Sequence, residues 1–245
     1  LSGNNSYSGT TTVDSGELIV TNNSALGTNA GDTYIKTNGT LDLKNVQIGD
    51  EDIDIFGTLK TSSGSSSTSG LVYLGTTWSE INVNSGAELV LSGIVYDDGG
   101  FKNLSKVGAG TLILTNNANN FYQTNIGEGT VQVGNGGTTG ILGRGHVTNN
   151  DTLYINRSDS VNLSSIVSST DDITGTGNVT AHIGGALNVD RTINLSGASS
   201  KIILAAGYNT AAGTESGGDV TLTNTITTSN TGTVTIFSGN ANTST

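Results

Sequence analysis

A short phrase recurs along this chain and limits what the chain can fold into. A small residue, usually glycine, is followed by one further residue and then by apolar residues at alternate positions, as in Gly110-Thr-Leu-Ile-Leu114 and Gly129-Thr-Val-Gln-Val133. The phrase begins at residues 16, 39, 57, 86, 110, 129, 151, 177, 185, 218 and 232. From residue 16 to residue 177 the successive spacings are 23, 18, 29, 24, 19, 22 and 26 residues. A repeat of this length predicts a solenoid, in which each coil stacks on the one before.

Most of these phrases alternate apolar and other residues, as half-buried strands do, and turn-forming Gly, Asn, Ser and Asp lie between them. The chain contains no proline, which would remove a backbone donor from a central strand. We therefore expect an all-β fold, a right-handed parallel β-helix (solenoid) of roughly 11 coils. An antiparallel sandwich is the alternative. The Asn-Gly and Asp-Gly pairs typical of its hairpins are few, at residues 38–39, 98–99 and 135–136.

The domain organisation follows from the repeat. Residues 1–245 are predicted to form a single β-helix segment, because the phrase runs through nearly the whole chain. Two stretches between phrases, near residues 61–70 and 207–218, are predicted to be loop insertions because Gly, Ser and Thr dominate them. Leu163-Ser-Ser-Ile-Val167 has a weak helical spacing, but its Ser and Val content favours a strand and corner.

The charge pattern excludes several classes of partner. The formal net charge is -11, and the basic residues are scattered, with no two adjacent. Nucleic acid and anionic membrane surfaces need a basic footprint, so we expect neither as a partner. No apolar run approaches the roughly 20 residues of a membrane-spanning helix, so no membrane insertion is expected. The absence of cysteine excludes disulfides and thiolate sites.

Two stretches resemble a known repeat. LSGNNSYSGTTTVDSGELIV, residues 1–20, is similar to the autotransporter-associated β-strand repeat. Ser2 departs from the usual Thr, and the matching positions are Leu1, Gly3, Asn5, Tyr7, Gly9, Thr11, Val13, Gly16, Leu18 and Val20. Residues 114–133 are a weaker match, in which Phe121 is one place off the aromatic position. Each match is followed by a similar continuation, which begins with Ala25-Leu-Gly27 or with Ile141-Leu-Gly143.

The resemblance implies a passenger domain of a type V secreted protein of Gram-negative bacteria. Such passengers are mostly right-handed parallel β-helices, displayed on the cell surface or released from it. The resemblance therefore implies a location at the bacterial cell surface or outside the cell. It is specific at the two matched stretches and elsewhere consists of the shared Gly-Thr-Leu phrase.

Residues for nucleophilic catalysis are few. A serine protease needs a serine with a histidine and an aspartate partner. The histidines are His146, in a Gly-rich turn, and His182, in an expected strand, while Asp14-Ser15-Gly16 only partly matches a protease motif. We interpret both histidines as surface or corner residues.

Acidic groups are the other candidates for chemistry. Asp52 and Asp54 are expected on one strand face, with Ile53 and Ile55 on the other. Together with Asp50 and Glu51 they form a candidate Ca²⁺ patch or a solvated acidic loop, and the latter is favoured. The pairs Asp97-Asp98 and Asp171-Asp172 read as exposed turns. A polysaccharide-active β-helix enzyme that uses such carboxylates remains an alternative function.

Aromatic and amide side chains suggest two further roles. Trp78, with Tyr73 and Glu80 nearby in sequence, is a candidate for stacking on a sugar ring, although such a residue more often fills a corner of a coil. The asparagines are expected to stack as ladders at the turns of successive coils; they are Asn116, Asn117, Asn119, Asn120, Asn149 and Asn150.

The sequence thus predicts a non-catalytic, surface-exposed β-helix that acts as an adhesin or as a rigid stalk. No catalytic, cofactor-binding or metal site is predicted, and no cofactor. The expected partners are surface proteins or glycans of a host or neighbouring cell, or further copies of the chain. A self-assembling surface-layer or filament subunit is a third alternative, because β-helix ends present open strand edges.

Overall fold

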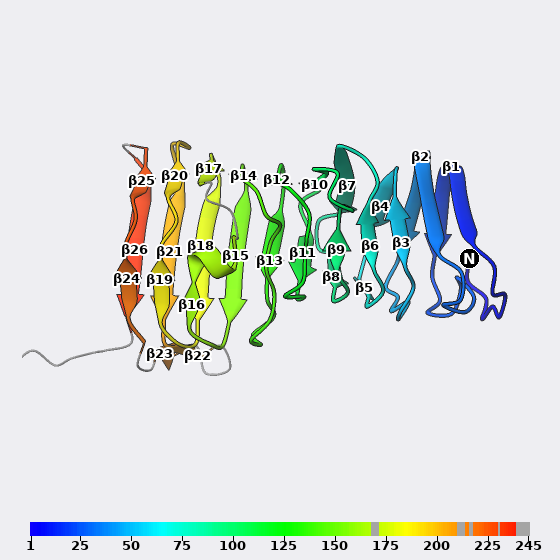
Figure 1. Ribbon diagram of the computed structural model, residues 1–245, viewed down its shortest axis with the longest axis horizontal. Coiled ribbons are helices and arrows are strands. Elements are labelled where there is room, and N and C mark those ends of the chain that lie inside the picture. The colour runs from blue at the N-terminus through cyan, green and yellow to red at the C-terminus, as the bar shows by residue number, and fades with distance from the viewer. Residues whose placement is uncertain (168–171, 210–213, 216–217, 230, 239–245) are drawn as a thin grey trace, which may run out of the picture.

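The computed structural model describes residues 1–167, 172–209, 214–215, 218–229 and 231–238. Strands stack side by side along one axis, from β1 at the N-terminal end to β25 and β26 at the other (Figure 1). All but one of the strand pairings between named strands are parallel, and they join strands one turn apart in the sequence. The predicted parallel β-helix is confirmed.

Each turn contributes up to three short strands, which form three faces of the solenoid. The first face carries β3 (Ile53–Ile55), β6 (Val72–Leu74), β9 (Val95–Tyr96), β16 (Val161–Asn162), β19 (Leu187–Val189) and β24 (Val220–Leu222). The second carries β4 (Thr58–Thr61), β7 (Trp78–Val83), β10 (Asn103–Val107), β12 (Thr124–Ile126), β14 (Val147–Asn149), β17 (Ile173–Gly175), β20 (Ile193–Leu195) and β25 (Ile226–Thr228). The third carries β5 (Ser65–Thr68), β8 (Glu88–Leu91), β11 (Thr111–Leu114), β13 (Thr130–Val133), β15 (Thr152–Arg157), β18 (Asn178–Ile183), β21 (Lys201–Ala206) and β26 (Thr233–Ser238).

Two long strands begin the solenoid and join the first two faces. β1 (Thr11–Val20) pairs with β2 (Thr33–Leu43) over almost its whole length. The start of β2 pairs with β3 and its end pairs with β4, so one strand supplies a segment to each face. In the middle of the first face, backbone bonds from Asn120 to Val95 and from Leu142 to Ile166 connect the turns between β9 and β16.

The repeated phrase sets the register. Thr111 to Leu114 pair residue by residue with Thr130 to Val133, so two successive phrases are the same strand on two successive turns. The number of turns was slightly overestimated: about eight turns carry a strand on the third face, and the turns of β1 and β2 precede them. The phrases at residues 177 and 185 lie on β18 and β19, two faces of one turn, and those at 218 and 232 lie on β24 and β26.

The interior is a column of aliphatic side chains contributed by alternate residues of most strands. Buried polar residues also enter this column on the second face, among them Lys106 and Asn149. Lys106 is fully buried, and its ammonium donates to the carbonyls of Val107, Gly108 and Glu128. Asn149 is also fully buried and donates to the carbonyl of Asn178. Both side chains satisfy carbonyls that the strand ladders leave free at a corner.

At three places along the solenoid, a Leu-Gly pair packs one turn against an aromatic ring of the turn before. A Cβ at Gly27 would lie 3.0 Å from the Tyr7 ring, and a Cβ at Gly75 would lie 2.6 Å from the Phe56 ring. At Gly143 the distance to the Phe121 ring would be 2.5 Å. Since real Cβ atoms do not approach so closely, only glycine fits. This explains why both repeat-like stretches are followed by Leu-Gly.

The structure corrects one predicted loop insertion and two further local expectations. Residues 61–70 contain the regular strand β5, because Ser66 and Thr68 turn inward and bond to neighbouring carbonyls. The 207–218 stretch lies only partly within the described residues, where β22 (Tyr208–Asn209) and β23 (Thr214–Glu215) pair antiparallel. Leu163–Ser165 forms a short 3-10 helix rather than a strand. Most hydrogen bonds described for the asparagine side chains of the expected ladders join the backbone of adjacent turns, as when Asn119 bridges Val95 and Ile141, while Asn150 accepts from the Thr176 hydroxyl.

Candidate functional site

Aromatic and acidic side chains gather on the outside of the first face in the N-terminal half. One outward row runs across the turns through Tyr34, Asp54, Tyr73 and Tyr96, which are paired in register. An isolated bridge continues it to Asn120. These residues point outward because their neighbours along each strand, such as Ile53 and Ile55, are buried in the column. The backbone ladder therefore brings together residues about twenty positions apart.

A second outward row lies two residues earlier in each turn. It begins with Asp32 and Asp52 and continues with Leu71, Ile94 and Ala118. The Asp52 carboxylate accepts the Leu71 N–H at 2.6 Å, which ties the two turns together. We call the two rows, with the flanking residues Lys36, Phe56, Asp98 and Lys102, the aromatic–acidic surface.

The rings of this surface contact one another. Tyr73 lies 5.3 Å from Tyr96 and 6.0 Å from Phe56, measured between ring centroids. Lys102 lies 4.4 Å from the centroid of Tyr73, and Lys36 lies 5.5 Å from that of Tyr34. Tyr73 also donates to Asp98 at 2.9 Å and accepts from Lys102. The centre of the surface is thus held by ring packing and by its own ions.

The carboxylates give this surface a negative potential. Burial raises the pKa of Asp54, and the charges of Asp32 and Asp52 raise it further. The charge of Asp54, followed by that of Asp32, raises the pKa of the Tyr34 phenol. Ionised groups that change one another's pKa in this way add their electrostatic potentials over the same region of the surface.

A buried carboxylate anchors the edge of the surface. Asp97 is fully buried and accepts the backbone N–H groups of Gly99 and Lys102, each at 3.0 Å. Its carboxylate also accepts from the Arg144 guanidinium at 2.7 Å, which comes from 47 residues later in the chain. Asp97 is therefore a structural residue rather than an exposed turn residue, while its neighbour Asp98 is exposed as predicted.

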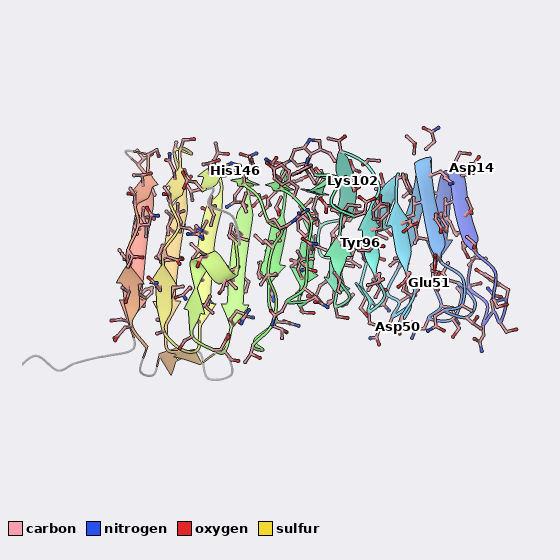
Figure 2. The ribbon with its side chains drawn as sticks, viewed as in Figure 1. Asp14, Asp50, Glu51, Tyr96, Lys102 and His146 are labelled. Carbon is pink, nitrogen blue, oxygen red and sulfur yellow. The ribbon has the colours of Figure 1, made fainter. Side chains whose placement is uncertain are left out.

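A hollow opens at the C-terminal end of the surface. It has a volume of about 380 Å³ and is lined by Leu71, Ile94, Tyr96, Ala118 and Asn120. Leu71 is 40% exposed, although its side chain is apolar. The hollow lies between the two outward rows, with the Tyr96 ring and the Asn120 amide on one side. Tyr96 and Lys102 are labelled midway along the rod in Figure 2.

The candidate Ca²⁺ residues do not converge. Ile53 and Ile55 are buried and Asp52 and Asp54 face outward, as predicted. Glu51, however, is buried, and its carboxylate accepts the Thr33 hydroxyl at 2.6 Å, so it is not a residue of a solvated loop. Asp50 is exposed and accepts from Ser69. Among the described residues, no group of three or more acidic or histidine side chains is placed to hold a metal ion.

The histidines lie apart from the protease-like motif. His146 contacts the Thr174 hydroxyl at 2.8 Å, and His182 contacts the Tyr154 hydroxyl at 2.9 Å. Burial lowers the pKa of His182. Asp14 lies in the first turn and His146 in a later one, well separated along the rod (Figure 2). The structure therefore does not bring a serine, histidine and aspartate of these motifs together. Asp171 lies outside the described residues.

The sugar-stacking candidates are divided between two faces. Trp78 and Glu80 share the outer side of β7, where Trp78 is 46% exposed rather than packed in a corner. Tyr73 lies on β6 of the first face, with Phe56 and Tyr96. The sequence reasoning missed Tyr34 and Tyr96. The signal that identifies them is a tyrosine between inward-facing residues once per turn, as in Val72-Tyr-Leu74 and Thr33-Tyr-Ile35.

Comparisons with known proteins agree with the predicted resemblance. The passenger-associated-transport-repeat matches residues 1–20 and 104–133. The chain is also 40% identical over 79 residues to the adhesin BmaC autotransporter of Brucella suis biovar 1 (strain 1330). That segment covers 32% of this chain and 2% of the relative, so the chain spans only a small fraction of the relative's length. No solved structure matches.

The fold and the repeats together define a parallel β-helix that carries passenger-associated repeats and resembles an autotransporter passenger. The resemblance to an autotransporter passenger that carries these repeats is confirmed. The same findings indicate a location at the cell surface or outside the cell. Within the described part of the chain, no helix has the length and hydrophobicity to cross a bilayer.

Proposed function

We propose that this chain is a non-catalytic adhesive segment of a surface-exposed passenger and that its aromatic–acidic surface makes the contact. The observation that carries the proposal is the row Tyr34, Asp54, Tyr73 and Tyr96, which places three tyrosines and one aspartate outward on four consecutive turns. A stalk needs only the backbone ladder and the buried column. Neither requires aromatic side chains in solvent, whereas binding surfaces are enriched in them.

The arrangement of polar groups favours binding over catalysis. His146 and His182 each contact a hydroxyl group, and Asp97 is bound by two backbone N–H groups and an arginine. Each of these groups serves the packing of adjacent turns. The similarity to a protein named as an adhesin supports the same reading.

A cell-binding assay tests this role. Beads coated with the chain are expected to bind epithelial cells or bacterial cells, and Tyr96→Ala is expected to reduce the bound fraction several-fold. Trp78→Ala is the matched control, because Trp78 is an exposed aromatic residue on a different face. Beads that bind no cells would leave the rigid stalk as the remaining role. Equal binding after both changes would show that the chain adheres through another surface and that the aromatic–acidic surface is not the contact.

A further inference from the structure

We infer that the partner of the aromatic–acidic surface is an uncharged polysaccharide chain that lies along the solenoid axis, with one sugar ring in the hollow beside Tyr96. This inference rests on the adhesive role proposed above and names its partner. Three properties of the surface support it: the shape of the surface, the chemistry of its lining and its charge.

The shape favours a linear ligand. The two outward rows lie two residues apart along each strand, which is about 7 Å, and adjacent turns are about 4.8 Å apart. Five turns, from Tyr34 to Asn120, therefore give a strip about 20 Å long and one or two side chains wide. A stable protein partner buries about 800 Å² on each side, far more than this strip offers. An extended sugar chain needs only a strip.

The lining of the hollow fits a sugar ring. Its volume of about 380 Å³ is typical of a small-ligand site. The Tyr96 ring, Leu71 and Ile94 supply apolar contact for the C–H face of a pyranose, and the exposed Asn120 amide offers both a donor and an acceptor. Toward the N-terminal end the apolar lining gives way to the Asp52 and Asp54 carboxylates, which accept hydrogen bonds from sugar hydroxyls.

The negative charge of the aromatic–acidic surface argues against an acidic polysaccharide as its partner. Four aspartates and two lysines belong to the surface, and Lys102 is already paired with Asp98 at 3.4 Å and lies over the Tyr73 ring. Since the whole chain carries a net charge of -11, a polyanion would be repelled at long range as well. A neutral polysaccharide experiences neither penalty.

Affinity electrophoresis of the purified chain tests this inference. Native gels would contain mannan, galactan or dextran as neutral probes, and polygalacturonate as the acidic probe. We expect at least one neutral polysaccharide to slow the parent chain, and polygalacturonate to have no effect. Tyr96→Ala is expected to weaken the binding about tenfold. Tyr96→Phe and the control Trp78→Ala should bind as the parent does.

Folding is checked on the same samples by circular dichroism. If Tyr96→Ala does not fold, Asn120→Ala removes the amide of the hollow at an exposed position and is expected to weaken binding severalfold. The inference is overturned if no neutral probe slows the parent chain, or if polygalacturonate is bound preferentially. It is also overturned if the folded variants bind the neutral probe as tightly as the parent chain.

Failure of this inference is distinguishable from failure of the adhesive role. Periodate oxidation of the target cells destroys sugar rings and spares most protein surfaces. If beads still bind oxidised cells through Tyr96, and no polysaccharide is bound, the adhesive role stands with a protein partner and the polysaccharide inference is wrong. If a neutral polysaccharide is bound but cells are not, the inference stands and adhesion to those cells is wrong.

Discussion

The first face of the solenoid has two halves that share an interior and differ on the outside. In the N-terminal half the outward side chains are Tyr34, Asp54, Tyr73 and Tyr96. In the C-terminal half, Asn162 pairs with Asn188, which pairs with Thr221. There the outer side chains bind one another across turns, as when Ser164 donates to Asp190 at 2.5 Å and Thr223 donates to Asn188 at 3.2 Å.

The inward rows of the two halves are alike. Ile53, Val72 and Val95 form the column in the first half, and Val161 and Leu187 form it in the second. The backbone ladder and the aliphatic column therefore suffice to build the face, whatever stands outside. The C-terminal half joins its outer polar side chains by hydrogen bonds between turns and has a smaller hollow, of about 190 Å³, beside Asn162 and Asn188. The N-terminal half presents partly exposed tyrosine rings and the larger hollow, of about 380 Å³. This difference is why we assign binding to the N-terminal half.

The largest effect is expected from the shared interior. Ile53→Ala removes buried aliphatic volume from the column and should lower the free energy of unfolding by about 2–5 kcal/mol. The adjacent outward change Asp54→Asn should leave stability unchanged or raise it by a few tenths of a kcal/mol, because burial and neighbouring carboxylates already raise the pKa of Asp54. Urea denaturation followed by circular dichroism measures both. An equal loss of unfolding free energy in the two variants would contradict our view that the inward residues stabilise the fold and the outward residues serve binding.

The pH dependence of stability is the next largest effect, and it comes from Lys106 on the second face. Burial lowers the pKa of Lys106 from 10.5 to about 8. Between these values the unfolded chain binds more protons than the folded chain, so stability rises as the pH increases from 8 toward 10.5. We expect a gain of about 1–3 kcal/mol, since the three carbonyls that accept from the ammonium offset part of the burial.

Urea denaturation from pH 7.5 to 9.5 measures this gain. The raised pKa values of Tyr34 and Tyr96 act in the opposite direction, but only above about pH 10, so this window avoids them. In Lys106→Met the titrating group is absent, and the rise should disappear. A rise that survives in Lys106→Met would assign the pH dependence to another group.

A smaller effect is expected at the edge of the aromatic–acidic surface. Asp97→Ala leaves the backbone donors of Gly99 and Lys102 without their acceptor and should cost about 1–2 kcal/mol. The loss should be local. Hydrogen exchange is expected to accelerate at residues 97–102 and to stay unchanged in β16 and β19. Faster exchange in β19 as well would show that the two halves of the face open together. That result would contradict the view that their outer surfaces are independent.

Most of the fold was predictable because successive copies of the repeated phrase pair with one another and so set the backbone register. The pairing of residues 111–114 with 130–133 follows from the phrase itself. The number of turns did not follow, because phrases on two faces of one turn, such as those in β18 and β19, read alike in sequence. The Ser-rich stretch at 61–70 was mistaken for a loop, since composition does not reveal that inward Ser66 and Thr68 can bond to carbonyls within the column.

The candidate site was less predictable than the fold. Asp52 and Asp54 were placed on one outward face correctly, but their partners Tyr34 and Tyr96 lie on other turns. Which residues meet across turns depends on the exact length of each turn, and these lengths vary: the row Tyr34, Asp54, Tyr73, Tyr96 advances by 20, 19 and 23 residues. A fixed repeat length does not align these residues. Nor does sequence spacing show that Trp78 lies on the neighbouring face.

The smallest effect is expected from placing an aromatic ring on the C-terminal half. Asn162 is exposed at the outer end of β16, and none of its side-chain atoms caps the short helix that follows. Asn162→Tyr should therefore change the free energy of unfolding by no more than about 0.5 kcal/mol. It should also add no polysaccharide binding in affinity gels, because the hollow there is about 190 Å³ against about 380 Å³ beside Tyr96, and Ser160, Asn188 and Thr221 add hydroxyl and amide groups to its lining. Binding gained by this single ring would mean that any exposed tyrosine on the solenoid suffices, and the hollow beside Tyr96 would lose its special role.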